Sequence, residues 1–238
     1  MTAIIARNTN LPALDKALEV QDFHRSCALY NGLLGDCDQP PVADEHIANL
    51  AALFVRHNAE KVLGIHLVHG HFKIPEGTVM LGTNFKNPTL RWANVTEIEN
   101  INPSTVHGHI FIFTEDGLHA YEFQQGPPPD LSGVGQGFLS DFVNYIVRNN
   151  LTNLIGLQVL GYCNDSMSEL ILDQGTVMLD SSIVKNTSVN GNPRVCQQNE
   201  KHAEMTSGNH KVFNAGKPHP KLENVEDLKV ALTEAGIL

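Results

Sequence analysis

The sequence predicts an α+β fold in which two related halves share one hydrophobic core. Three observations support this prediction: 42% of the 238 residues are hydrophobic and only 18% are charged, helical and then strand periodicities follow one another, and short segments recur in the same order. Glycine and proline usage is close to average, which excludes disordered and collagen-like chains. We therefore expect residues 1–238 to form a single globular unit, either barrel-like or built from paired sheets.

Two pairs of segments carry the repeat. The letters VRHN at 55–58 and VRNN at 147–150 each end a helical pattern and precede an apolar, strand-like run. The letters GTVML occur at 77–81 and again at 175–179. Because the order is the same in both halves, we predict an internal duplication of a module made of one helix and an antiparallel β-meander.

The duplication divides the chain into pseudo-repeats at 41–123 and 137–214. The linker between them, at 124–136, contains three consecutive prolines. Each half begins with an apolar stripe at helical spacing and continues with strand-like runs that are separated by turn signals. An Asn followed by acidic residues and a second apolar stripe predicts a C-terminal helix at 222–236.

The charge and hydropathy of the sequence argue against nucleic acid and membranes as binding partners. The net charge is -10, from 16 basic and 26 acidic residues, and the basic residues do not cluster, which argues against nucleic acid and anionic membranes. No apolar run approaches the roughly 18 residues that cross a bilayer, and the N-terminus lacks the apolar segment of a signal peptide. We expect a cytoplasmic protein with reduced cysteines and a small-molecule partner; a homo-oligomer is compatible with the sequence.

Histidine is the residue type in clear excess, with 12 copies. The tetrapeptide Val-His-Gly-His occurs twice, and its histidines are His69 and His71 in one copy and His107 and His109 in the other. Both copies lie inside strand patterns. Alternate residues of a strand share a face, so the two histidines of each pair are expected to point the same way.

The neighbours of each pair indicate which way that is. By strand parity, the first pair shares a face with Ile65 and the second pair with Phe111, whereas His66 points to the opposite side. Both pairs are therefore expected to line a largely apolar surface, either in the core or around a cavity.

Paired imidazoles on a strand are suited to metal binding, because neutral imidazole is the commonest transition-metal ligand among side chains. Glu76 follows the first pair and offers a carboxylate. Two histidines plus a carboxylate suit non-haem iron, whereas three histidines suit zinc or copper. The candidate ligands of a divalent metal such as Zn, Fe or Mn are His69, His71, Glu76, His107 and His109.

Part of this pattern resembles the first metal motif of the cupin family, in which two histidines and a glutamate bind a metal inside a small β-barrel. The resemblance is local and implies metal chemistry at the first histidine pair. It is carried by Gly64, His69-Gly70-His71, Glu76 and Gly82.

A broader resemblance covers about half of the chain. Residues 69–81, together with Ala-Tyr-Glu-Phe at 120–123, resemble a family of uncharacterised fungal proteins that carry a His-x-His-Phe segment followed by a Pro/Glu turn. This resemblance implies no particular function.

Two readings of the histidines remain open. Burial lowers the pKa of an imidazole, which leaves a neutral general base near neutral pH. The sequence therefore favours a small-molecule enzyme of the lyase, isomerase, cyclase or oxygenase type, with a histidine-lined pocket and with His69, His71, His107 and His109 as catalytic residues. The alternative is a non-catalytic ligand-binding or structural protein whose histidines are satisfied core groups.

A second metal hypothesis concerns the C-terminal part of the chain. Two cysteines and two histidines there form a Cys2His2 set, although their spacing is not that of a zinc finger. Surface polar residues in a loop-rich region are the alternative interpretation. The residues are Cys163, Cys196, His202 and His210.

Overall fold

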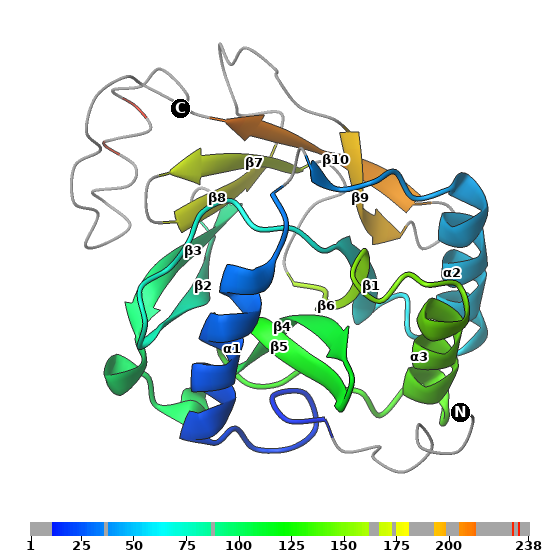
Figure 1. The fold of residues 1–238 in the computed structure, drawn as a ribbon, viewed down its shortest axis with the longest axis horizontal. Helices are drawn as coiled ribbons and strands as arrows, with labels where there is room; N and C mark the ends of the chain where they lie inside the picture. Colours follow the sequence, from blue (N-terminus) through cyan, green and yellow to red (C-terminus); the bar gives the residue numbers. More distant parts are fainter. Residues whose placement is uncertain are drawn as a thin grey trace.

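The structure, a computed structural model, has the predicted α+β architecture. Its helices pack around a curled, mixed β-sheet that forms a half-barrel (Figure 1). None of the helices within the described residues is long and apolar enough to cross a membrane. The structure describes residues 11–35, 38–86, 89–161, 167–172, 175–180, 193–198, 205–212, 230 and 233.

The described ranges contain three α-helices: α1 (Val20–Gly32), α2 (Asp44–Arg56) and α3 (Phe138–Arg148). The second and third were predicted from their apolar stripes, and they pack on each other through aromatic rings. The ring of Phe54 lies 4.8 Å from that of Phe138 and 6.0 Å from that of Phe142, centroid to centroid. Edge-on contacts of this kind add to the free energy of apolar burial.

Helix α1 was not predicted, although the sequence carries a signal for it. Phe23, Cys27 and Tyr30 recur at helical spacing and are buried. The N-terminus is capped because the Asp22 carboxylate accepts a hydrogen bond of 2.8 Å from the backbone N–H of Glu19. The helix packs on β2 and β5.

Ten strands form a single sheet in the order β1-β6-β4-β5-β2-β3-β8-β7-β10-β9. The curl of the sheet brings β9, at one end of this order, beside β1 at the other. Most neighbours are antiparallel, but β2 and β5 are parallel, as are β7 and β10. The bounds are β1 Leu63–Leu67, β2 Thr78–Lys86, β3 Thr89–Glu97, β4 Val106–Thr114, β5 Gly117–Gln125, β6 Ile155–Val159, β7 Met167–Leu172, β8 Gly175–Asp180, β9 Pro193–Gln198 and β10 Met205–Val212.

The predicted antiparallel meander is wrong. Hairpins form where the connection is only two residues long, at β2–β3, β4–β5 and β7–β8. The consecutive strands β9 and β10 also pair antiparallel across a longer connection. Elsewhere a strand with a longer connection finds a partner outside the predicted meander: β1 pairs with β6 and not with β2, and β3 pairs with β8 and not with β4. Together with the pairing of β4 and β6, three strand pairs therefore join the two halves in one mixed sheet.

The units α2–β1 and α3–β6 have the same local geometry. Each helix is followed by an asparagine in the left-handed region, Asn58 at φ 52° and Asn150 at φ 55°. The next residue donates its N–H to a helix carbonyl five positions earlier in both units, at 2.9 and 2.8 Å. The two GTVML segments, in contrast, occupy different places, since 77–81 opens the first strand of one hairpin and 175–179 lies in the second strand of another. The internal duplication therefore stays a prediction.

The remaining boundary predictions are met only in part by the described residues. The first two positions of the predicted linker at 124–136 belong to β5, and the chain from Gly126 to Gly137 then leads to α3. Within the predicted helix at 222–236, Val230 and Thr233 are described, and both are helical and exposed.

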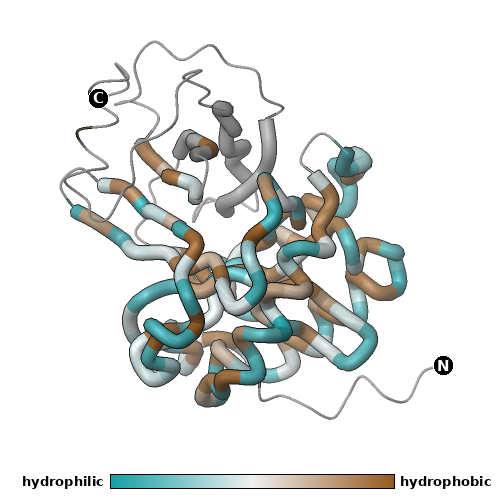
Figure 2. Tube along the Cα trace, turned by 60° about the vertical axis from the view of Figure 1, so that its left-hand side comes forward, coloured by the Kyte–Doolittle hydropathy of each residue, from teal (hydrophilic) through white to brown (hydrophobic). Residues whose placement is uncertain are grey.

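The two faces of the sheet differ in chemistry. Helices α2 and α3 cover one face, where their apolar side chains join those of the strands in the main core. Figure 2 shows hydrophobic and hydrophilic residues interspersed along the strands, as expected for a sheet with unlike faces. The core includes Leu50, Phe54, Leu63, Ile65, Phe111, Phe138, Phe142, Ile146, Ile155 and Leu157.

The close approach of β4 and β6 gives a test of the fold. A Cβ added at Gly156 would lie 2.5 Å from the backbone oxygen of Phe111 and 3.0 Å from Val68. We expect Gly156→Ala to lower the free energy of unfolding by about 1–3 kcal/mol, measured by urea denaturation. Gly32→Ala is the matched control, because nothing lies within 4 Å of a Cβ there. Equal urea midpoints for the two variants would contradict the pairing of β4 with β6.

Candidate metal centre

One face of the sheet carries several buried polar side chains beside apolar ones such as Met80 and Ile110, and we call it the polar face. Residues directly opposite each other on neighbouring strands point to the same side. Glu169 on β7 is opposite Met178 on β8, which is opposite Arg91 on β3. The register of the other strands can be followed in the same way. The polar residues on this face are His66, Gln158, His107, Glu122, Gln124, Arg91 and Glu169.

Irregular pairing between β4 and β5 places both histidines of the second pair on the polar face. The register shifts between Gly108 and Ile110 and again between Ile110 and Phe111. A β-bulge of this kind inserts an extra residue, here His109, and reverses the alternation beyond it. The prediction that this pair shares a face with Phe111 is therefore wrong, because Phe111 lies in the main core on the opposite face.

The first histidine pair does not lie on a strand, as had been predicted, because β1 ends before it. The chain turns there, and Gly70 forms an isolated β-bridge with Gly35. This turn stacks the ring of His69 on that of His66, with centroids 5.2 Å apart and planes 19° apart. His66 therefore lies with the histidine pair, and the prediction that it points away is wrong.

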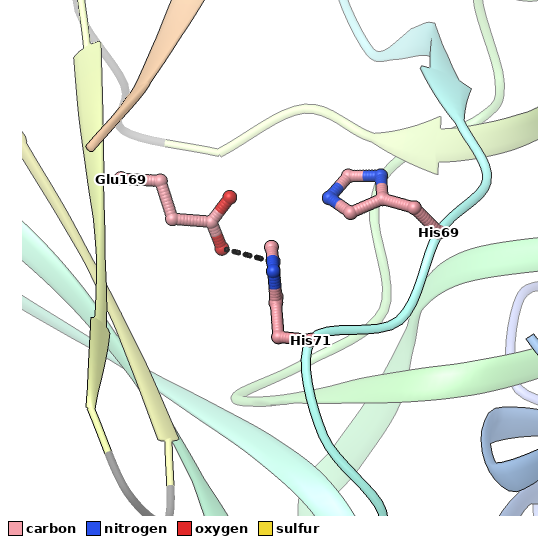
Figure 3. Close-up of side chains that lie close together, drawn as sticks. All are labelled: His69, His71 and Glu169. Carbon is pink, nitrogen blue, oxygen red and sulfur yellow. Dashed lines mark ion pairs between the residues drawn. The ribbon is translucent and has the colours of Figure 1, made fainter. Parts of the chain in front are cut away.

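His69, His71 and Glu169 converge from two distant parts of the chain (Figure 3). One ligand atom from each residue lies within 4.8 Å of the others. His71 Nε2 is 3.4 Å from Glu169 Oε1, and the two imidazole centroids are 4.7 Å apart. The side chains of His71 and Glu169 are 7% and 12% exposed, so the group is largely withdrawn from solvent.

The hydrogen bond of His69 determines which nitrogen faces the group. His69 Nδ1 is 2.5 Å from the backbone oxygen of Leu67, and because a carbonyl can only accept, Nδ1 carries the proton. In a neutral ring the lone pair is then on Nε2, the nitrogen that points toward Glu169 in Figure 3. Metal-binding histidines are commonly oriented by such a bond to a backbone carbonyl.

The geometry fits a metal ion after a small closure. In a tetrahedral site two ligand atoms at about 2.1 Å from one ion lie about 3.4 Å apart, so a pair separated by up to 4.8 Å must draw together by up to about 1.4 Å. Two imidazoles and one carboxylate with open positions suit a catalytic zinc ion or non-haem iron. This group is suited to the divalent metals predicted from the sequence, Zn, Fe or Mn.

The other predicted ligands lie elsewhere. Glu76 is exposed in the turn before β2. His107 Nδ1 lies 3.1 Å from the backbone oxygen of Gly126, to which it donates, and His109 Nε2 accepts a hydrogen bond of 3.3 Å from the amide of Gln158. In the part of the chain that the structure describes, the one candidate metal group is His69, His71 and Glu169. The second set, Cys163, Cys196, His202 and His210, lies outside the residues whose side chains are described.

Sequence reasoning missed Glu169 and Arg91. Arg91 is a charged residue between apolar neighbours, Leu90 and Trp92, and Glu169 begins an apolar run that starts at Leu170. A charge inside or beside a strand-like apolar run is a signal for a buried charge with a specific role. Glu169 lies in the second half, far in sequence from the histidines. Only the pairing of β7 with β8 and of β8 with β3 brings it to the polar face.

Arg91 is held in a buried network over a glycine. Its Nε donates to Gln124 Oε1 at 2.8 Å and its Nη2 donates to Glu122 Oε2 at 3.0 Å. A Cβ at Gly82 would lie 2.5 Å from both Arg91 Nη2 and Gln124 Oε1, so glycine leaves the room that the guanidinium occupies. Burial raises the pKa of Glu122; nearby Arg91 opposes this shift and Glu169 adds to it.

Burial lowers the pKa of two histidines on the polar face, His107 and His109. Burial lowers the pKa of His109 well below the ordinary value, and the positive charge of Arg91 lowers it further. Burial also lowers the pKa of His107, although the hydrogen bond to Gly126 opposes this shift. The pKa of Tyr30, which reaches this region from α1, is raised by burial and by the carboxylates of Glu122 and Glu169. Its phenol therefore stays protonated at neutral pH.

Comparisons of the chain with protein-family models, with curated proteins and with solved structures gave no match. The resemblances to the cupin motif and to the fungal family therefore stay predictions. In this structure the carboxylate beside the histidine pair is that of Glu169 and not that of Glu76.

The neutral state of His109 predicts a pH dependence of stability. Its pKa is lower in the folded state than in the unfolded chain, so this contribution is present above the unfolded pKa of about 6.5 and is lost as the pH falls below it. We expect His109→Gln to reduce the slope of unfolding free energy between pH 6.5 and 5 by up to about 1.4 kcal/mol per pH unit. Urea denaturation as a function of pH measures this slope. His24→Gln, at an exposed position of α1, is the control; an equal change in both variants would contradict the assignment.

Proposed function

We propose that this protein is a small-molecule enzyme that depends on a divalent metal, with His69, His71 and Glu169 as the metal ligands. The observation that carries the proposal is the convergence of two imidazoles and one carboxylate in a largely buried position. Burying a carboxylate costs several kcal/mol unless a positive charge compensates it. A divalent cation supplies that charge.

A protonated His71 paired with Glu169 is the competing explanation, since it also compensates the carboxylate. The orientation of His69 favours the metal. With Nδ1 donating to Leu67, the neutral ring presents an Nε2 lone pair toward an oxygen that is also an acceptor. Two acceptors that face each other are stabilised when a cation lies between them.

The polar face supports acid/base chemistry beside such an ion. A metal bound there would act as a Lewis acid that polarises a substrate oxygen. His107 is buried on the same face and its Nδ1 donates to the backbone oxygen of Gly126, which leaves the Nε2 lone pair of the neutral ring to accept a proton from the substrate. These groups suit a lyase, isomerase or cyclase, and an iron ion in the same ligand set would also suit an oxygenase.

We propose as well that the two halves of the chain arose by internal duplication. The metal site would then be a feature that only one of the two copies carries. The matching units α2–β1 and α3–β6 place Gly161 where His69 stands in the first half. If the histidines served only to stabilise the module, both copies would need them. Their presence in one copy supports a function that the other copy does not share.

Metal content tests the proposed ligands directly. We expect protein purified without chelator, or reconstituted with Zn, Fe, Mn, Ni or Cu, to hold about one equivalent of metal by elemental analysis. His69→Ala, His71→Ala and Glu169→Gln should lose it. Glu76→Gln removes an exposed carboxylate nearby in sequence and should retain the metal. If the wild-type protein binds no metal after reconstitution, the proposed metal site is contradicted.

Thermal stability separates the metal from the simple ion pair. An ion that binds the folded state, at a free concentration of 100 times its Kd, stabilises it by about 2.7 kcal/mol. We therefore expect the Tm to rise with metal and to fall with EDTA, and Glu169→Gln to abolish this response. If His71 and Glu169 form only an ion pair, EDTA will leave the Tm unchanged and Glu169→Gln will lower it with or without metal.

A further inference from the structure

The polar face offers a second group that is suited to a ligand, the guanidinium of Arg91. Its side chain is only 6% exposed. Its hydrogen bonds use Nε and Nη2, to Gln124, Glu122 and the backbone oxygen of Phe123. The Nη1 group, with two further N–H donors, has no hydrogen-bond partner among the residues that the structure describes. Nη1 is not one of the fully buried atoms that lack a partner, so it stays accessible and can donate to an anionic ligand.

Arg91 and the candidate metal group lie on the same face at a limited separation. Glu169, Met178 and Arg91 are directly opposite one another on three successive strands. Neighbouring strands are about 4.8 Å apart, so the backbones of Glu169 and Arg91 are separated by about 10 Å. The guanidinium of Arg91 reaches over Gly82 to Glu122, and Glu122 is close enough to Glu169 for the two carboxylates to repel each other. A ligand of a few carbon atoms would therefore span the two groups.

The charges on this face favour an anion. Arg91 and Glu122 balance each other in their ion pair, and His109 is uncharged. A divalent metal outweighs the single negative charge of Glu169, which leaves the loaded face with a net positive charge. Complementary charge favours binding of an anionic molecule over a neutral one of the same shape.

We propose that Arg91 binds the carboxylate of a small organic acid whose second oxygen function binds the metal held by His69, His71 and Glu169. The inference rests on the proposed metal site and narrows its substrate class to short-chain acids with an oxygen donor at the far end. Arginine suits this role because its planar fork matches the two oxygens of a carboxylate.

Ligand titration of the Co²⁺-loaded protein tests this inference. The probes are malonate, succinate and glutarate, each compared with the monocarboxylate of the same chain length: propionate, butyrate and pentanoate. Calorimetry and the visible Co²⁺ spectrum report binding. A second carboxylate held by Arg91 should make at least one diacid bind about tenfold more tightly than its monoacid, as one charge-assisted hydrogen-bonding pair would.

Two variants assign the preference to Arg91. The double variant Arg91→Met with Glu122→Gln removes the arginine without leaving a buried carboxylate uncompensated. In this variant the preference for the diacid should disappear, and Co²⁺ should still bind. Arg91→Lys keeps the charge but loses the planar fork, and should retain part of the preference. Arg56→Met is the matched control, because Arg56 is exposed and pairs with Asp141 on α3; it should bind diacids as the wild type does.

The outcomes distinguish this inference from the proposed function. If Co²⁺ binds but no diacid exceeds its monoacid, the role of Arg91 is overturned and the metal site stands. The role is also overturned if the double variant keeps the full preference. If Co²⁺ does not bind to the wild type, the proposed function fails and this inference fails with it.

Discussion

The arrangement of the polar face depends on the buried ion pair between Arg91 and Glu122. The pair crosses from β3 to β5 over the intervening strand β2, where Gly82 leaves space for the guanidinium. Removing one partner of such a pair typically costs about 3–5 kcal/mol, because the other charge is left uncompensated. The pair therefore couples three neighbouring strands and commits the charge of Arg91 mainly to Glu122.

Glu169, in contrast, lies beside His71, with 3.4 Å between His71 Nε2 and Glu169 Oε1. The two carboxylates are close enough that Glu169 raises the pKa of Glu122. A cation bound by Glu169 would reduce this repulsion and so strengthen the ion pair of Glu122 with Arg91. Metal binding at one end of the polar face and the buried pair in its middle are thus energetically linked, although no metal ligand is shared between them.

The sequence predicted local features well and long-range pairing poorly. The stripes of α2 and α3, the hairpin strands and the importance of the first histidine pair all follow from residues close in sequence. The strand order does not, because β1–β6 and β3–β8 join segments whose pairing depends on the whole sheet. Glu169 was missed for this reason, and Phe111 was assigned to the wrong face because one inserted residue at His109 reverses strand parity.

The position of the candidate site argues against a purely structural role. The turns that end α2 and α3 have the same local geometry, so a residue needed for that geometry would be expected after both. The histidines of the turn after β1 have no such counterpart, since Gly161 follows β6 at the matching place. Their partner, Glu169, comes from the half of the chain that lacks the histidines. The group is thus assembled once, from side chains that the two matching turns do not need for their geometry, and this supports the proposal that it binds a metal.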